Sequence, residues 1–330
     1  MNKPTQIKPH DRLAAACAPE MEAVNRLIRD RMASKNAPRI PEVTAHLVEA
    51  GGKRVRPLLT VACAKMCGYE GEDHLKLAAT VEFIHTATLL HDDVVDESRQ
   101  RRGRPTANLL WDNQSSVLVG DYLFARSFQL MVETGSLRVL DILSGAAATI
   151  AEGEVLQLSA ARNLGTTEET YLHVVRGKTA ALFEAACEVG GVIAGVPDAQ
   201  VAALARFGDS LGVAFQIVDD WLDYGGAGDG IGKDLGDDFR EGKLTLPVIR
   251  AIARGDQAER SFWREALELA RSDDFERARE IVTRHGALEE TRLEALAWRD
   301  RARAALDELP ESPLRDMLGD LADFVVARAA

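Results

Sequence analysis

The chain has 330 residues, of which 46% are hydrophobic and 28% charged, a composition typical of a globular protein with enough apolar material for a large core. Its formal net charge of −12 argues against a nucleic-acid-binding protein, because such proteins usually present a basic surface. The N-terminal segment lacks the long apolar core of a signal peptide, and no run of about 18 apolar residues occurs. We therefore expect a cytoplasmic protein without a membrane span.

The four cysteines are spaced unlike a disulfide framework, and no CxxC pair occurs. Cys63 and Cys67 are four residues apart in a helical pattern, which is compatible with a metal-binding pair. Small buried thiols are the favoured interpretation, since unpaired cysteine commonly packs as a small apolar residue.

Apolar residues recur every three or four positions along most of the chain, which predicts helices. The clearest helical segments are 75–97, 115–133, 137–160, 167–195 and 199–224. The expected breaks are 37–42, 68–73, 101–106, 161–169, 195–199 and 225–238. Strand signals are scarce. We predict an all-α protein with a single domain over 1–330, including an N-terminal helical extension over 1–36 and C-terminal amphipathic helices over 251–330.

Two short segments concentrate aspartates inside apolar helices. The segment "LLHDDVVDES" (89–98) contains Asp92, Asp93 and Asp96, and "FQIVDDWLDY" (215–224) contains Asp219, Asp220 and Asp223. On a helix, residues four apart lie on one face about 5–6 Å apart, so these carboxylates repel one another unless a cation binds. Carboxylate oxygens suit Mg²⁺, and two such helices facing each other would hold several ions. The alternative is a solvated acidic face, which the apolar neighbours of both motifs disfavour.

Basic residues cluster in glycine-containing segments beside the acidic ones. They are Lys53, Arg54 and Arg56 in "GGKRVRP", Arg99, Arg101, Arg102 and Arg104 in "RQRRGRPT", and Lys233 and Lys243 further on. Glycine allows close approach of backbone amides, and guanidinium groups bind phosphate oxygens in pairs. Surface ion pairing is the alternative for any one residue. Together, carboxylates and cations predict a site for a metal-bound diphosphate.

These motifs resemble the trans-polyprenyl diphosphate synthases, the long-chain (octaprenyl/decaprenyl) branch of the isoprenyl diphosphate synthase family. The resemblance is carried by "GGKRVRP", "EFIHTATLLHDDVVDESRQRRGRPT", "GDYLFARSFQ", "AEGEVLQL", "GKTAALFEAA", "GVAFQIVDDWLDY" and "GKDLGDDFREGKLTLPVI" within 51–249. It implies one large helical domain of the isoprenoid synthase type around a central cavity, Mg²⁺ as cofactor, and a homodimer. One departure is Asp234, where the family pattern implies asparagine after the lysine.

The resemblance also implies roles for individual residues. Asp92 and Asp96, with Asp93, would bind Mg²⁺ on the allylic diphosphate, and Asp219 would bind a further ion, with Asp220 and Asp223 near. Isopentenyl diphosphate would be held by Lys53, Arg56, His85 and Arg102, and the allylic diphosphate by Arg101. The allylic side would be lined by Lys178, Thr179, Gln216, Lys233 and Lys243, with Glu154 and Gln157 facing the cavity. Dipoles at Lys178, Thr179 and Gln216 would stabilise an allylic carbocation. A core histidine at His85 and buried structural amides at Gln157 and Gln216 are the alternatives.

Product length is predicted from the residues one turn before Asp92. Ala87 and Thr88 are small, so a growing chain would pass them into a tunnel that continues past Ile84 and Val81. Phe128 and Met131 are candidates for its floor. The alternative is that Ala87 and Thr88 only allow close helix packing.

The predicted reaction is Mg²⁺-dependent, sequential condensation of isopentenyl diphosphate onto an allylic diphosphate, most simply farnesyl diphosphate. The product would be a C40–C50 diphosphate, octaprenyl or decaprenyl, made for a quinone side chain and passed to a membrane. Alternatives are a geranylgeranyl or farnesyl diphosphate synthase, a non-catalytic subunit of a heteromeric synthase, and a terpene cyclase. Absent membrane spans disfavour a membrane prenyltransferase.

Overall fold

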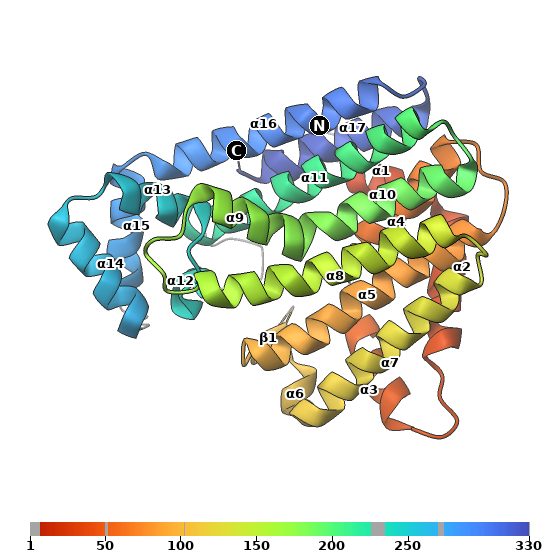
Figure 1. The fold of residues 1–330 in the computed structure, drawn as a ribbon, viewed down its shortest axis with the longest axis horizontal. Coiled ribbons are helices and arrows are strands. Elements are labelled where there is room, and N and C mark those ends of the chain that lie inside the picture. The colour runs from red at the N-terminus through yellow and green to blue at the C-terminus, as the bar shows by residue number, and fades with distance from the viewer. Residues whose placement is uncertain (1–6, 50–51, 102, 226–234, 270–273, 330) are drawn as a thin grey trace, which may run out of the picture. The chain divides into compact units, whose positions relative to one another are not determined.

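The structure is a computed structural model that describes residues 7–49, 52–101, 103–225, 235–269 and 274–329. In these segments helices predominate, and the strands form one short hairpin (Figure 1). The prediction of an all-α fold is confirmed. The chain forms two compact units, which are described separately. Unit 1 comprises Met1–Ala147, Leu182–Ala205 and Leu306–Leu321, and unit 2 comprises Ala148–Ala181, Arg206–Ala305 and Ala322–Ala330.

Unit 1 is built on a long, apolar helix. Its elements are α1 (Pro9–Ala16), α2 (Ala18–Met32), α3 (Arg39–Glu49), α4 (Val55–Met66), α5 (Asp73–Val95), β1 (Gln100–Arg101), β2 (Arg104–Pro105), α6 (Ala107–Leu110) and α7 (Asn113–Val132). They are joined by the first part of α8 (Leu137–Ala160), most of α10 (Ala181–Ala194), the start of α11 (Asp198–Gly225), the end of α16 (Ala287–Asp307) and most of α17 (Pro313–Val326). Helix α5 packs against α2, α4 and α7. Because it is covered on several sides, side chains such as Leu77, Phe83 and Ile84 are fully buried.

The N-terminal helices are integrated into unit 1. Leu13 of α1 and Val24 and Ile28 of α2 are fully buried, and α2 packs against α4 and α5. The N-terminal segment therefore contributes to the core of unit 1.

Unit 2 surrounds a second, more aromatic core. Its elements are the ends of α8 and α11, α9 (Glu168–Val175), the π turn η1 (Arg176–Ala180), α12 (Asp237–Glu241), α13 (Leu246–Arg254), α14 (Gln257–Leu269), α15 (Phe275–Arg284), most of α16 (Ala287–Asp307), the end of α17 (Pro313–Val326) and η3 (Ala327–Ala329). Trp263, Tyr224 and Phe239 are among its largest fully buried side chains. Helix α13 packs against α9, α14 and α15. This core supports the pocket described below.

The observed helices follow the predicted segments closely, with two differences. A break was predicted over 37–42, whereas α3 begins at Arg39. Pro41 lies in the first turn of α3, where a missing N–H removes no intrahelical bond. The continuous helix predicted over 167–195 contains the π turn η1 instead.

Helix α11 could cross a membrane by length and composition alone. In the structure, 67% of its apolar window is buried inside the protein. Core helices of proteins outside membranes have this same pattern.

Candidate active site

The first acidic motif lies at the carboxyl end of α5. The helix ends at Val95, and the backbone N–H of Asp96 donates to the carbonyl of Asp92 over 2.8 Å. This bond closes the last turn, so Asp92 and Asp96 stay one turn apart on the same side, as their spacing predicts. Both side chains are half-buried.

Asp93 points elsewhere and is fully buried. The guanidinium of Arg101, from β1, approaches its Oδ1 with Nη2 at 2.7 Å and Nε at 2.9 Å. Burial raises the pKa of Asp93, and the charge and hydrogen bond of Arg101 oppose that shift. The Asn108 amide also donates to the Asp93 carbonyl over 3.2 Å. Asp93 thus ties the β1–β2 hairpin to α5 and fixes the position of Arg101.

The basic turn before α4 lies in unit 1 as well. Arg54 has the left-handed conformation, at φ 44°, and its guanidinium pairs with Glu82 of α5 over 2.9 Å. Arg56 lies in the first turn of α4, with its guanidinium carbon 4.6 Å from the centre of the Phe183 ring and Nη1 3.3 Å from Nε2 of His85. The structure therefore brings Arg56 and His85 together. Lys53 is exposed at the entrance to this turn.

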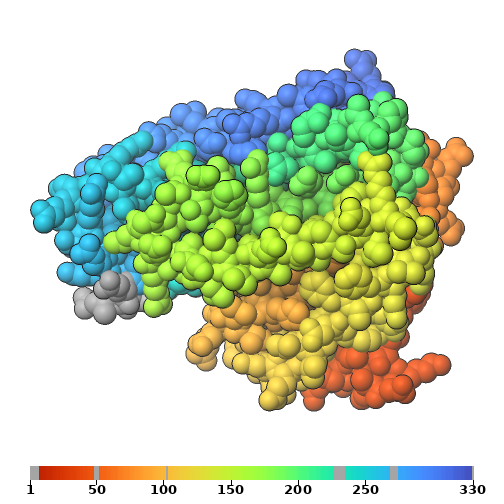
Figure 2. All heavy atoms as spheres, viewed as in Figure 1, coloured from red at the N-terminus to blue at the C-terminus, as the bar shows by residue number. Residues whose placement is uncertain are grey.

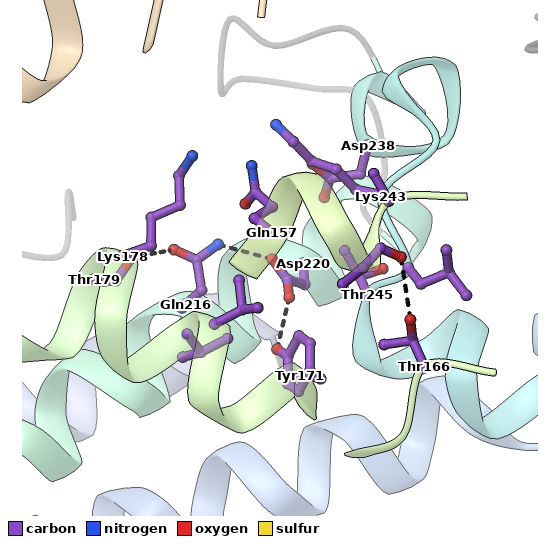
Figure 3. Close-up of a pocket in the computed structure, with 15 residues that line it drawn as sticks. Gln157, Thr166, Tyr171, Lys178, Thr179, Gln216, Asp220, Asp238, Lys243 and Thr245 are labelled. Atoms are coloured by element: carbon purple, nitrogen blue, oxygen red, sulfur yellow. Dashed lines mark hydrogen bonds between the residues drawn. The ribbon is translucent and has the colours of Figure 1, made fainter. Parts of the chain in front are cut away.

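The second acidic motif lies near the carboxyl end of α11, in unit 2. Asp219 is half-buried, whereas Asp220 is 3% exposed. Both oxygens of Asp220 accept hydrogen bonds, from the Tyr171 hydroxyl over 2.6 Å and from Nε2 of Gln216 over 2.8 Å. Gln216 in turn accepts from the hydroxyl of Thr179 over 2.8 Å. Figure 3 shows this chain of hydrogen bonds from Thr179 to Tyr171.

Asp223 holds the segment that enters α12. Its carboxylate accepts from the backbone N–H groups of Gly236, Asp237 and Asp238, at 3.0–3.2 Å. These are N–H groups at the start of a helix, where a carboxylate is favoured.

Burial raises the pKa values of three carboxyl groups at this end of α11. It raises that of Asp220 to about 6, opposed by the Tyr171 and Gln216 hydrogen bonds, and that of Asp223 to about 6, opposed by the backbone N–H groups. Burial also raises the pKa of Asp238, and the nearby charges of Asp220 and Asp223 add to it. Mutually repelling carboxyl groups of this kind create a negative potential that favours a cation.

A pocket of about 90 Å³ opens between α8, α9, η1, α11 and the segment around α12. Its polar lining residues are Gln157, Thr166, Tyr171, Lys178, Thr179, Gln216, Asp220, Asp238, Lys243 and Thr245. In Figure 3 the side chains of Lys178, Gln157 and Lys243 point to the same side of the pocket, and Tyr171 lies on the opposite side of Asp220. One water needs roughly 10–15 Å³ measured in this way, so the pocket has room for several waters or a small polar group.

The π turn η1 places two of these lining residues. A Cβ atom on Gly153 of α8 would lie 2.8 Å from the Cα of Gly177, and one on Gly177 would lie 2.7 Å from the Cα of Gly153. Glycine is required at both positions because the two backbones touch. Beside this contact, Nζ of Lys178 pairs with Oε2 of Glu154 over 2.9 Å. The close approach of α8 thus fixes Lys178 and Thr179 at the pocket.

Several residues that were predicted to line the allylic side lie at the pocket of unit 2. The structure brings Lys178, Thr179, Gln216 and Lys243 to one pocket, together with Gln157. Lys243 also pairs with Glu241. Arg102, Lys233 and Asp234 lie outside the described residues.

Four of the polar residues that line the pocket were not predicted as site residues. They are Thr166, Tyr171, Asp238 and Thr245. Asp238 stands in the quoted "GKDLGDD" motif, which was a usable signal, but Tyr171 lies 49 residues from its partner Asp220 and no local pattern marks it. Thr245 is buried, and within the described chain its hydroxyl has no hydrogen-bond partner.

The positions proposed to set product length lie on α5. Ala87 is fully buried, and the hydroxyl of Thr88 donates to the carbonyl of His85 over 2.8 Å. Met131 of α7 is buried, whereas Phe128 is 44% exposed. Of the two candidate floor residues, only Met131 belongs to the interior of unit 1.

The donor groups fit Mg²⁺. Asp92, Asp96 and Asp219 offer half-buried carboxylates, and carboxylate oxygens are the ligands that Mg²⁺ prefers, with water or substrate phosphate completing its shell. Over the described segments, no group of three or more histidine, cysteine, aspartate or glutamate side chains is arranged to hold a metal alone. Cys63 and Cys67 are free thiols.

Residues 37–284 match the polyprenyl synthetase family. The chain belongs to this family. The predictions of the family and of a prenyltransferase are thereby confirmed. Among curated members, the octaprenyl diphosphate synthase of Escherichia coli (strain K12) is 44% identical over 319 residues, covering 93% of this chain and 99% of that protein. The all-trans-nonaprenyl-diphosphate synthase (geranyl-diphosphate specific) of Rhodobacter capsulatus is also 44% identical, covering 96% and 97%.

Solved polyprenyl synthetase structures agree closely with this one. The decaprenyl diphosphate synthase from Rhodobacter capsulatus is 67% identical with a TM-score of 0.94, covering 97% of this chain and 99% of that chain. The polyprenyl synthase from Caulobacter crescentus CB15, complexed with calcium and isoprenyl diphosphate, is 51% identical with a TM-score of 0.93, covering 99% and 100%.

Proposed function

We propose that this chain is a long-chain trans-polyprenyl diphosphate synthase that adds isopentenyl diphosphate units sequentially to an allylic diphosphate. The observation that carries the proposal is 67% identity to a decaprenyl diphosphate synthase over 97% of the chain. Relatives named for shorter products are less similar, such as a geranylgeranyl diphosphate synthase from Saccharolobus solfataricus at 36%. The intact aspartate motifs disfavour a non-catalytic subunit.

We propose Mg²⁺ as the metal, bound by Asp92 and Asp96 at the first motif and by Asp219 at the second. When bound, Mg²⁺ would neutralise charge on the departing diphosphate. Asp93 and Asp220 are buried and already hydrogen-bonded, so their proposed role is to hold Arg101 and Gln216 in place. Asp223 would keep the segment before α12 in position.

Each of the two proposed substrates would be bound by its own set of basic side chains. Arg56 and His85, with Lys53 and Arg102, would bind isopentenyl diphosphate, and Arg101 would bind the allylic diphosphate. Lys178 and Lys243, with Lys233, would contact the allylic side. These cations offset the charge that develops on the leaving group, and a dry surrounding strengthens the effect. The hydroxyl of Thr179 and the amide of Gln216 present dipoles to the same pocket.

The product length is proposed as eight to ten isoprene units. The relatives named above carry the names octaprenyl, nonaprenyl and decaprenyl, so their names bracket this range. The small side chains of Ala87 and Thr88, one turn before Asp92, would let a growing chain pass. Ala87→Phe should shorten the product by several units, because a ring there would close the tunnel. Unchanged product length in this variant would contradict the tunnel.

We further propose that the protein is a cytoplasmic homodimer. Four exposed apolar side chains of α7, Val117, Leu118, Phe128 and Val132, fall within about 100° of its circumference, and Leu137 at the start of α8 is 82% exposed. The surface of α7 and of the start of α8 is drawn in yellow in Figure 2. A second copy of the chain would cover it. Four free cysteines suit a reducing compartment.

Labelled isopentenyl diphosphate tests the reaction. The purified chain, given farnesyl diphosphate and Mg²⁺, should incorporate the label into a prenyl product. A terpene cyclase would consume the allylic diphosphate without incorporating the label, and a non-catalytic subunit would consume neither substrate.

A further inference from the structure

The hydrogen-bond chain behind the pocket has a fixed direction. An ionised Asp220 can only accept, so Tyr171 must donate its hydroxyl proton and Gln216 must present its NH₂ group. The carbonyl oxygen of Gln216 is then turned toward Thr179, which donates to it. One buried carboxylate therefore determines which end of the Gln216 amide faces which neighbour.

The π turn allows two contacts with α11, one from Tyr171 of α9 to Asp220 and one from Thr179 of η1 to Gln216. Tyr171 and Thr179 are eight residues apart, which in a regular α-helix would separate them by about 80° around the axis. The extra residue of a π turn removes one step of about 100°, which leaves them only about 20° apart. Both side chains can then reach Gln216 and Asp220, which are one turn apart on α11.

Tyr171 is well placed to hold Asp220 at the inner end of this series of hydrogen bonds. It is 4% exposed and packs in the core of unit 2, and its hydroxyl approaches Asp220 over 2.6 Å. Without that hydroxyl, the Gln216 bond would be the one side-chain hydrogen bond left to buried Asp220 among the described residues, and the carboxylate would be free to rotate. The amide of Gln216 would lose its fixed orientation with it.

We propose that Tyr171 is a positioning residue for the allylic side of the site, acting through Asp220 on Gln216. The inference rests on the proposed function, because it assigns Gln216, Thr179 and Lys178 to the allylic diphosphate. Tyr171 lines the inner end of the pocket, opposite the side to which Lys178 points, so its effect on the substrate is indirect (Figure 3).

The test compares Tyr171→Phe with Tyr224→Phe. Each variant loses one hydroxyl from a buried ring, but the Tyr224 hydroxyl has no hydrogen-bond partner among the described residues. For Tyr171→Phe we expect kcat to fall about tenfold and KM for the allylic diphosphate to rise severalfold, because a hydrogen bond to a charged group is lost. KM for isopentenyl diphosphate should stay within twofold, since Arg56 and His85 are untouched. Tyr224→Phe should behave as the unsubstituted chain.

Two results would overturn the inference. One is a Tyr171→Phe enzyme whose kcat and KM for the allylic diphosphate both stay within twofold, or change no more than in Tyr224→Phe. The other is independent of how the variants fold: a crystal structure of the unsubstituted chain with the Tyr171 hydroxyl beyond hydrogen-bonding distance of Asp220. If the unsubstituted chain consumed no isopentenyl diphosphate, the proposed function itself would fail instead.

Discussion

The two acidic motifs have the same spacing but hold their second aspartate in different ways. In the first, buried Asp93 faces the cation Arg101, and in the second, buried Asp220 accepts from the neutral donors Tyr171 and Gln216. In both, the second carboxylate ties a neighbouring segment to the helix that carries the motif. In each motif the second carboxylate is therefore an inward anchor, and the partner of that anchor differs between the two motifs.

The difference in partner has an electrostatic consequence. Burial raises the pKa of Asp220 to about 6, and hydrogen bonds from neutral donors oppose this rise. Burial also raises the pKa of Asp93, and the full charge of Arg101 opposes that rise. Neutralising Asp220 should therefore destabilise the fold less than neutralising Asp93, because in the described segments only Asp93 of the two has a charged partner.

The largest effect is expected from the outward carboxylates. Asp92→Ala and Asp219→Ala should each lower kcat about 10²–10³-fold, because each removes a proposed metal ligand at the departing diphosphate. Steady-state kinetics with saturating Mg²⁺ measure this, and circular dichroism should show an intact helical fold. Asp300→Ala is the control, since Asp300 is an exposed aspartate of α16. Equal activity in all three variants would remove the metal sites from the mechanism.

A smaller effect is expected when the π turn η1 is displaced from its contact with α8. Gly153→Ala forces α8 away from η1, so Lys178 and Thr179 should shift and kcat should fall about tenfold, with a loss of about 1–3 kcal/mol in unfolding free energy. Gly145→Ala, on the same helix, has open space at its Cβ and should keep full activity. Steady-state kinetics and urea unfolding of Gly153→Ala and Gly145→Ala test this prediction. Similar behaviour of the two variants would show that the glycine contact does not position the pocket.

The smallest effect is expected in unfolding free energy when either buried carboxylate, Asp93 or Asp220, is neutralised. Asp93→Asn should cost about 1–3 kcal/mol of unfolding free energy because it leaves Arg101 without its charge partner, and Asp220→Asn should cost about 1 kcal/mol or less at pH 8. The raised pKa of Asp220 favours the folded state below its ordinary pKa, and this contribution is lost as pH rises through about 6. Asp220→Asn should therefore lower the free energy of unfolding more at pH 5 than at pH 8. Urea unfolding of metal-free protein at both values tests this, and a larger loss from Asp220→Asn at pH 8 would reverse the comparison.

The helices and the outward carboxylates were accessible from the sequence. Apolar periodicity over 75–97 and 199–224 located α5 and α11 closely, because each helix has a long buried face. The four-residue spacing of Asp92 and Asp96 placed them on one side of α5, since that relation depends only on helix geometry.

What the sequence did not show depends on contacts between distant segments. The pairs Tyr171–Asp220 and Gly153–Gly177 join residues 49 and 24 positions apart, and Gly177 lies within the π turn. A local pattern contains no information on such pairs. The same limit applies to Asp93 and Asp220, whose burial depends on which segment covers each helix.

The measurement that tests the central claim most directly is the chain length of the dephosphorylated product. The purified protein would be given farnesyl diphosphate, isopentenyl diphosphate and Mg²⁺, and the alcohol analysed by chromatography and mass spectrometry. We predict a product of eight to ten isoprene units. A product of four units or fewer would contradict the assignment as a long-chain synthase.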